Sequence, residues 1–391
     1  MTNTGPTLHV PTYTTYTLQT TSPLFTTLPP EIRTQIFTYT LSPFEDNSNP
    51  YQKETYWARP GYNAPQKTCT ELLRTCKAIY AETWFLPFAL AEHVFYLTGR
   101  DRAPGMRIAG KNRSGRAFGE CLEMVHQVHN KKTEDEGRAP LETGNIQVFA
   151  QLYMLEPGDA FQRLLNTPYL RPRQVRLTIR YTDFWHWENN RRLYIDGKWV
   201  SVVRFPESVR RFVVDFESID RRRGEVDIIA GQAVEKWVFR RTDDRVLTAK
   251  KEDLAVSRWT GSSMFGSRRW IRDEVRPGEL DYYVVTATWT VSRAQANAEK
   301  SDEHTHPAPQ DTVTGSTPNS DADSRPTVRV PEVFTQPLPP YAGNTFITEL
   351  DMREAGVTMG MDAAESWEAV RAYRNSRRRA LLPAPPPRRV L

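Results

Sequence analysis

Apolar residues recur at helical spacing near the start of the chain. In residues 28–41, a Leu-Pro-Pro-Glu sequence is followed by Ile32, Ile36 and Tyr39, which fall on one face of a helix. Prolines in the first helical turn cost little, because the amide groups there have no partner within the helix. The pattern predicts a helix that ends before Pro43.

A second amphipathic pattern covers residues 68–84. Thr68 and Glu71 have the spacing of a capping box, in which a hydroxyl and a carboxylate each accept a free backbone N–H. Apolar residues then follow at i, i+1, i+4, i+7 and i+8, counted from Leu72. The sequence thus predicts a second helix, joined to the first by a polar and aromatic loop over residues 42–67.

Strand patterns dominate the chain between residues 93 and 291. Residues 176–181 and 211–216 alternate in the same way and lie 35 residues apart, which indicates two parallel strands of an α/β layer. The apolar stretch 146–155 fits either a strand or a helix. The other expected elements are strands at 93–97 and 281–291, helices at 159–166 and 225–234, and a hairpin around residues 243–244. We predict an α+β protein, with N-terminal helices followed by a mixed α/β domain that has a β-rich core.

Composition divides the chain into six segments. The expected segments are a disordered, uncharged extension (1–21), a helical element (22–98), a mobile insertion with one helix-like stretch at 118–128 (99–144), the mixed α/β domain (145–291), a disordered linker rich in Ser, Thr, Asp and Pro (292–340), and a short helix at 361–379 with a Pro/Arg-rich tail (341–391). The linker is nearly free of large apolar residues, so burial cannot offset the entropy of ordering it.

Charge and composition narrow the classes of partner. The chain has 52 Lys and Arg against 47 Asp and Glu, and a net charge of +5 over 391 residues is too small to favour a nucleic-acid partner. No apolar run reaches the roughly 20 residues that a membrane-spanning helix needs, so no membrane partner is expected. Three cysteines cannot form a disulfide framework, and residues 1–30 lack a basic signal region. We expect an intracellular protein, in the cytoplasm or the nucleus.

Few residues form a pattern typical of catalysis or metal binding. The sequence has no phosphate-binding glycine loop, nucleophile elbow or zinc-protease signature. Cys121, His126 and His129 lack a fourth zinc ligand, and His304 and His306 lie in the expected linker. We predict no catalytic residue, no cofactor and no metal site.

Asp215 and Glu217 are the strongest candidates for acid–base chemistry. They alternate with Phe216, so both carboxylates should lie on the face of the strand that points away from the core. Such a pair could act as acid and base. Solvent exposure or pairing with Arg180 on a neighbouring strand explains the two residues without catalysis. Cys76, on the apolar face of its helix, is expected to be a small core residue.

An aromatic cluster occupies residues 184–187. It is interleaved with arginines at positions 171, 173, 176, 180, 191 and 192. Rings beside guanidinium groups could bind single-stranded nucleic acid. The same residues could cap a β-rich core, with arginines packed over rings. Nearby acidic residues dilute the local charge and favour the core interpretation.

Two motifs resemble a known family. Residues 28–41 resemble the opening of an F-box, with its Leu-Pro dipeptide, acidic residue and amphipathic helix. The sequence Leu-Leu-Arg-Thr-Cys-Lys-Ala-Ile-Tyr-Ala-Glu, residues 72–82, resembles the later helix of the F-box-like proteins of filamentous fungi. The resemblance covers roughly residues 24–98. It departs from an F-box in the 26-residue loop that separates the helices, where the family has a compact three-helix spacing.

The resemblance implies a function in protein–protein recognition, as a substrate receptor of a Skp1-type ubiquitin ligase. By this resemblance the adaptor would contact Leu28, Pro29, Ile32, Ile36 and Leu41, and the downstream region would bind an unknown target protein. The hypothesis requires Ile32 and Ile36 to be exposed in the isolated chain. Two other classes stay open: a nucleic-acid-binding protein that uses the Arg and Trp residues of 171–223, and an unrecognised enzyme.

Overall fold

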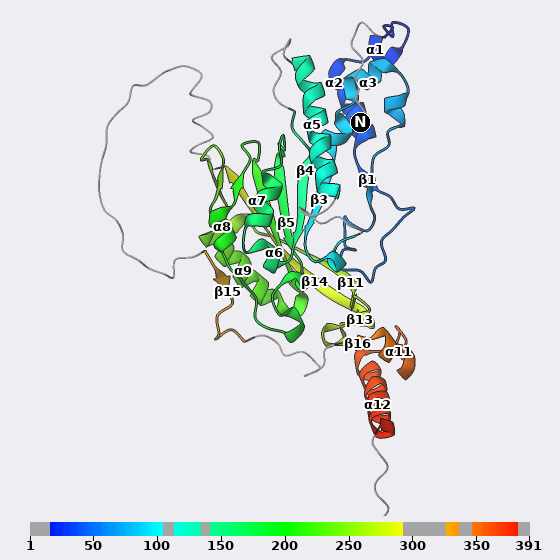
Figure 1. The fold of residues 1–391 in the computed structure, drawn as a ribbon, viewed down its shortest axis with the longest axis vertical. Helices are drawn as coiled ribbons and strands as arrows, with labels where there is room; N and C mark the ends of the chain where they lie inside the picture. The colour runs from blue at the N-terminus through cyan, green and yellow to red at the C-terminus, as the bar shows by residue number, and fades with distance from the viewer. Residues whose placement is uncertain (1–15, 105–112, 134–140, 292–325, 336–345, 382–391) are drawn as a thin grey trace, which may run out of the picture.

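The computed structural model describes residues 16–104, 113–133, 141–291, 326–335 and 346–381. It is an α+β structure around a mixed sheet, as the sequence predicts. The strands of this sheet follow the order β3-β4-β5-β8-β14-β10-β9-β7, and β11 pairs with β14 beside β10 (Figure 1). Their bounds are β3 (Glu92–Leu97), β4 (Asn145–Ala150), β5 (Gln174–Ile179), β8 (Arg211–Ile219), β14 (Glu279–Val291), β10 (Val246–Thr248), β9 (Phe239–Arg241), β7 (Arg204–Phe205) and β11 (Ala255–Ser262).

Strands β3, β4, β5 and β8 are parallel neighbours, and β14 runs antiparallel to β8. The two look-alike segments of the sequence are β5 and β8, which lie side by side with Leu177 opposite Val214. The predicted hairpin is the antiparallel pair β9 and β10. The undecided stretch 146–155 is both a strand and a helix, because β4 gives way at Gln151 to α6 (Leu152–Leu155).

Helices cover one face of the sheet and bury its main core (Figure 1). They are α5 (Arg113–Thr133), α6, α7 (Asp159–Leu165), α8 (Lys198–Val202) and α9 (Arg223–Lys236). On β8, Phe212, Val214 and Phe216 alternate toward these helices and are fully buried. Trp199, Trp237 and other aromatic side chains pack around them in edge-to-face and tilted arrangements.

Helix α5 confirms the helix-like stretch predicted at 118–128 and shows that this part of the expected mobile insertion is packed. Its Leu122 and Val125 are buried, and Phe118 packs against Phe95 of β3 with ring centroids 5.1 Å apart. A basic, Gly-containing sequence still makes a helix here because its few apolar residues line up on one face. Residues 105–112 and 134–140 of the same segment lie outside the described residues.

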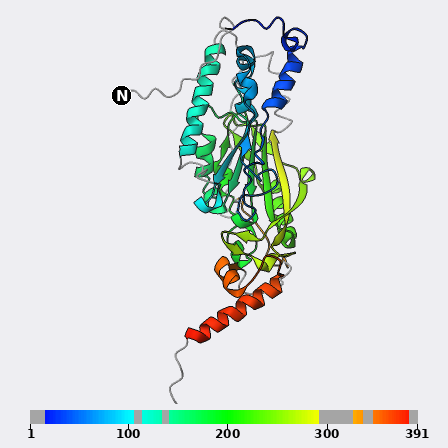
Figure 2. The same cartoon turned by 90° about the vertical axis from the view of Figure 1, so that its right-hand side faces the viewer.

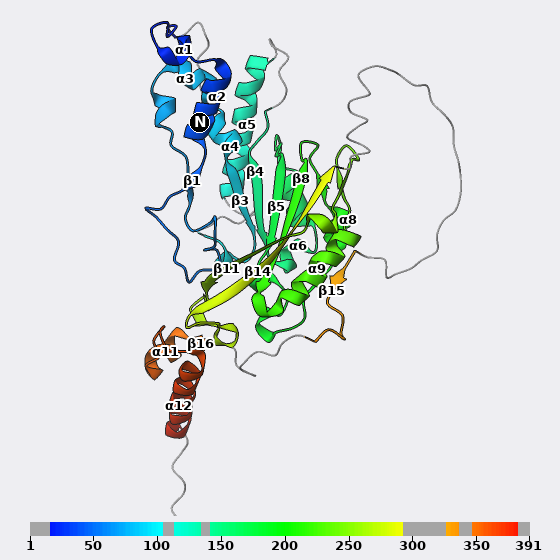
Figure 3. The ribbon, with the colours of Figure 1, turned by 180° about the vertical axis from the view of Figure 1, so that it is seen from behind.

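The opposite face of the sheet is crossed by residues 44–67, which we call the crossing segment (Figure 3). It begins with β1 (Phe44–Glu45) and ends with β2 (Gln66–Lys67), two short strands that pair with each other. Between them, Tyr56 stacks on Phe265 at 5.4 Å and Tyr62 packs edge-on against Phe149 at 5.0 Å. The loop that the sequence places between two helices is therefore a packed part of the fold.

A helical unit forms one end of the molecule. It contains α1 (Pro23–Thr26), α2 (Pro30–Leu41), α3 (Lys77–Thr83), α4 (Leu86–Leu90) and the 3-10 turn Glu71–Arg74. The second predicted helix starts later than expected, because the extended backbone of Cys76 (φ −155°, ψ 160°) separates the turn from α3. Cys76 itself caps α3, with its Sγ accepting the N–H of Ile79 at 3.5 Å. The predicted start at Thr68 is wrong for this reason.

The C-terminal part packs on the preceding domain in two pieces, each of which adds a strand to a small sheet separate from the main one. In residues 326–335, β15 (Val328–Arg329) pairs with β6 (Tyr194–Ile195), and Val328 is fully buried. This piece corrects the predicted linker, since its alternating valines let it pack onto α9. The rest of the predicted linker, residues 292–325 and 336–340, lies outside the described residues.

The second piece is a small helical cap on a three-stranded sheet. Strands β12 (Met264–Phe265), β13 (Arg268–Arg269) and β16 (Ile347–Thr348) carry α11 (Glu349–Ala355) and α12 (Ala363–Leu381). Helix α12 confirms the helix predicted over 361–379. Most of the expected N-terminal extension (1–21) lies outside the described residues. The expected tail from residue 382 lies wholly outside them. Among the helices described, none is long and apolar enough to cross a membrane.

Candidate functional site

Helix α2 presents an apolar stripe to solvent. Ile32 is 41% exposed, Ile36 is 40% exposed and Tyr39 is 83% exposed. These residues stand at i, i+4 and i+7, so they share one face of the helix, and the exposed Pro29 lies at its start. We call Pro29, Ile32, Ile36 and Tyr39 the α2 apolar face.

The opposite side of α2 faces the helical unit. Phe37 and Leu41 are 2% and 0% exposed, and α2 packs against α4. The resemblance places Leu41 at the adaptor surface, but this residue follows Phe37 by one helical turn and therefore points into the interior. Leu28 is half-buried. Tyr39 is the most exposed member of the stripe. The helical spacing places it on the same face as Ile32 and Ile36, but the resemblance does not include it among the adaptor contacts.

Arg33 fixes the position of α2. Its Nη1 donates to the carbonyl of Leu28 at 3.1 Å, and its Nη2 donates to Glu82 Oε1 at 3.5 Å. The guanidinium also lies 5.3 Å from the ring centre of Phe25. The apolar face is thus carried by a helix that is tied to α1 and α3.

Polar side chains form a second candidate site, on the sheet face below the crossing segment. Asp215 of β8 accepts hydrogen bonds from Arg176 Nε (2.7 Å) and Nη2 (2.9 Å), from Thr178 Oγ1 (2.9 Å) and from Thr286 Oγ1 (2.7 Å). Gln147 Nε2 continues the network to β4 by donating to Thr178 Oγ1 at 3.0 Å. The network therefore joins four neighbouring strands.

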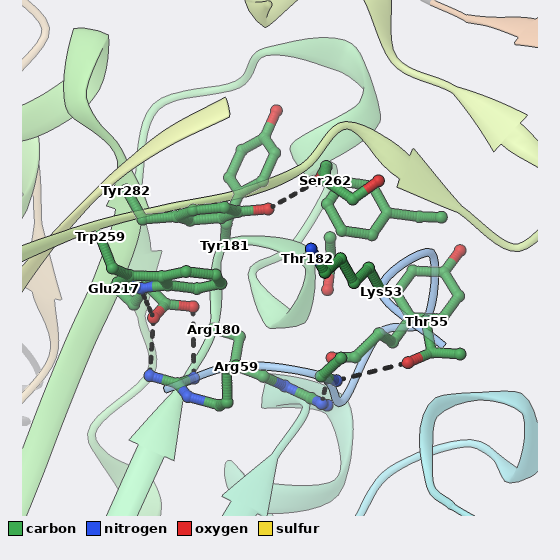
Figure 4. Close-up of a pocket in the computed structure, with 13 residues that line it drawn as sticks. Lys53, Thr55, Arg59, Arg180, Tyr181, Thr182, Glu217, Trp259, Ser262 and Tyr282 are labelled. Atoms are coloured by element: carbon green, nitrogen blue, oxygen red, sulfur yellow. Dashed lines mark hydrogen bonds and ion pairs between the residues drawn. The ribbon is translucent and has the colours of Figure 1, made fainter. Parts of the chain in front are cut away.

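Glu217 holds the crossing segment against this face. Arg59 donates from Nη2 to Glu217 Oε2 at 2.7 Å and from Nη1 to Oε1 at 3.3 Å, and Trp259 Nε1 donates to Oε2 at 3.0 Å (Figure 4). Arg180, the partner expected from the sequence, instead pairs with Asp183 at 2.6 Å. The prediction that Asp215 and Glu217 share the face away from the core is confirmed, but both are buried. Arg59 of the crossing segment covers Glu217, whereas Arg176, Thr178 and Thr286 surround Asp215.

The two carboxylates differ in electrostatics. Burial acts to raise the pKa of Asp215, but the hydrogen bonds and charge of Arg176, with the Thr286 hydroxyl, outweigh burial and lower this pKa. Burial raises the pKa of Glu217, and the opposing charge of Arg59 does not fully offset it. All four carboxylate oxygens already accept hydrogen bonds from protein donors. This arrangement stabilises the sheet and its cover, and each Asp215 oxygen accepts two hydrogen bonds, so Asp215 could take up a proton only by breaking a contact.

The other candidate residues take structural positions. His126 stacks on Tyr169 with ring centroids 4.0 Å apart. Within the described residues, no group of three His, Cys, Asp or Glu side chains is placed to hold a metal ion. His304 and His306 lie outside the described residues.

The aromatic cluster at 184–187 is part of the core. Phe184 and Trp187 are each 3% exposed, so their faces are not open to a stacked base. Trp185 is half-buried and donates its Nε1 hydrogen to Glu156 Oε2 at 2.7 Å. This geometry favours the core interpretation of the cluster.

The sequence matches no protein-family model and no curated protein, and the fold matches no solved structure.

Proposed function

We propose that this chain is a protein–protein recognition module whose α2 apolar face binds a Skp1-type adaptor, so that the chain acts as a substrate receptor of a ubiquitin ligase. The observation that carries the proposal is the exposure of Ile32, Ile36 and Tyr39 on one helical face. The resemblance of residues 28–41 and 72–82 to F-box-like proteins identifies the class of partner. The downstream sheet domain would then hold the target protein.

Physical chemistry supports a docking role for this face. Apolar residues that cluster on one exposed helical stripe lose contact with water when a partner groove covers them. The opposite side of α2 is already buried through Phe37 and Leu41, so the stripe can meet a partner without unfolding the helical unit. Large side chains at the centre of such an interface typically contribute about 2 kcal/mol or more each to binding.

A binding experiment with the full chain tests the proposal. The wild-type chain, immobilised at neutral pH, is expected to retain a purified Skp1-type adaptor. An Ile32→Asp plus Ile36→Asp variant should weaken binding by about 100-fold or more, because two carboxylates would enter an apolar interface.

The matched control places the same two carboxylates elsewhere. Val256→Asp plus Val275→Asp changes apolar residues that are 51% and 52% exposed, outside α2. This variant should bind as the wild type does, and circular dichroism should show that all three proteins are folded. Absence of binding by folded wild type, or an equal loss in the control, would overturn the proposal.

A further inference from the structure

Helix α12 packs through only its first half. Ser366 and Val370 are fully buried, and Val370 belongs to a small core with Met264 and Ile271. Beyond this point the helix loses its cover, and residues 375–379 are all exposed. Figures 1 and 2 show α12 projecting from the end of the molecule that lies opposite the helical unit.

The projecting half is strongly basic. Arginines occupy positions 371, 374, 377, 378 and 379, and the sequence contains no Asp or Glu after Glu368. Arg374 is neutralised by Asp351, to which its Nη2 donates at 2.7 Å. Arg371 lies 3.6 Å from Glu368, but both side chains are more than 60% exposed and such a pair contributes little. In the part of the chain that the structure describes, Arg377, Arg378 and Arg379 form no ion pair.

Only part of this charge stabilises the fold. Arginines three or four residues apart on a helix repel one another, at a cost of about 0.2–0.5 kcal/mol per pair. The negative end of the helix dipole favours Arg378 and Arg379 in the last turn, but this effect does not reach Arg371 or Arg377. The end of the helix, with Arg377, Arg378 and Arg379 exposed, presents a cationic surface that an anionic partner can meet.

We propose that the basic half of α12, formed by Arg371, Arg377, Arg378 and Arg379, binds the phosphate backbone of duplex nucleic acid. The inference goes beyond adaptor binding and uses the opposite end of the molecule. All the cations are arginines, whose planar fork donates two parallel hydrogen bonds to a phosphate, whereas lysine offers a point charge. A bare helix of about 10–12 Å diameter also fits the major groove of a DNA duplex, which is about 12 Å wide.

The arrangement favours backbone contact over stacking on single strands. The large rings beside these arginines, Trp367 and Tyr373, are both half-buried, and the Arg374 guanidinium lies 5.8 Å from the centre of the Trp367 ring. Arg371 and Arg378 stand seven residues apart, which places them on the same face about 10 Å apart along the axis. Binding should therefore depend on salt and be largely independent of base sequence.

Fluorescence anisotropy with a labelled 20-base-pair DNA duplex tests the proposal on the full chain. Neutralising about four phosphates predicts a slope near −3.6 in a plot of log affinity against log salt concentration. Binding should weaken roughly 100-fold between 50 mM and 200 mM KCl. An Arg377→Gln, Arg378→Gln, Arg379→Gln variant should reduce the slope to about −0.9 and weaken binding at least tenfold at 100 mM.

The control removes the same net charge from another surface. Arg191, Arg211 and Arg240 are exposed on other elements, and their replacement by Gln should leave the slope unchanged. An equal loss in this control would show that binding follows net charge and would overturn the proposal. No binding by folded wild type at 50 mM would also overturn it. Competition by polyglutamate as strong as that by unlabelled duplex would overturn it as well, and would assign α12 to an acidic protein partner instead.

Discussion

The hydrogen bonds around Asp215 make this residue the most informative single position in the sheet. The Asp215→Asn change keeps the size of the side chain but removes its charge. Four donors now point at the two carboxylate oxygens, two from Arg176 and one each from Thr178 and Thr286. An Asn side chain has only one oxygen, so its amide group must face donors that it cannot satisfy.

The size of the effect follows from burial and from the type of bond. Breaking a buried ion pair by removing one partner typically costs about 3–5 kcal/mol. The Arg176 side chain is 38% exposed, so water can partly replace the lost carboxylate. We therefore expect Asp215→Asn to lower the free energy of unfolding by about 2–3 kcal/mol, at or just below the lower end of that range. For a domain of this size, this corresponds to a fall of roughly 5–10 °C in melting temperature.

Urea unfolding at pH 7, followed by tryptophan fluorescence, measures this loss. Because the folded-state pKa of Asp215 is lowered, its contribution is complete above the unfolded pKa of about 3.9 and is lost as the pH falls through the folded value. The difference between wild type and variant should therefore shrink below pH 4. Arg176→Gln should lower the free energy of unfolding by a similar amount. The double variant should lose less than the sum of the two single losses, because both changes remove the same contact. A loss under about 0.5 kcal/mol for Asp215→Asn would refute the role given to the network.

Three further changes test other parts of the fold. Burial lowers the pKa of His93 to about 4, so only the unfolded chain takes up this proton between pH 6.5 and 4. Between pH 7 and pH 5, the free energy of unfolding measured in urea should fall by about 2 kcal/mol more for the wild type than for His93→Phe. An equal fall in both proteins would contradict this prediction. Gly144→Ala should cost more than about 2 kcal/mol, because its Cβ would lie 1.8 Å from the Ala91 carbonyl oxygen. In Gly231→Ala of α9, the new Cβ would meet no atom within 4 Å, so the variant should be more stable by about 0.5–1 kcal/mol. Thermal melts should place Gly144→Ala below and Gly231→Ala above the wild type, and any other order would contradict the two predictions.

Local patterns predicted those parts of the fold that local chemistry determines. Alternation in β5 and β8 identified two neighbouring parallel strands, and it also placed Asp215 and Glu217 on the face away from the helices. Helical spacing identified α2 and its exposed stripe. In each of these cases a short run of residues carries the whole signal.

Long-range contacts account for what the sequence did not reveal. Nothing near Arg59 indicates that its partner is Glu217, and without that pair the crossing segment resembles an ordinary loop. Leu41 and Phe37 are apolar like the exposed residues of α2 but lie on its other side, and the position of α4 decides which side of α2 is buried. Strand β11 was missed because its exposed residues lack the apolar alternation of a half-buried strand; pairing with β14 determines its conformation.

The distance along the chain between Arg59 and Glu217, 158 residues, sets an order of assembly during synthesis. At roughly 5–20 residues per second, Glu217 follows Arg59 from the ribosome by about 10–30 s. During that interval Arg59 lacks its carboxylate partner, and the part of the sheet that contains β8 has not formed. Residues 44–67 therefore reach their final position on the sheet only after β8 has been synthesised.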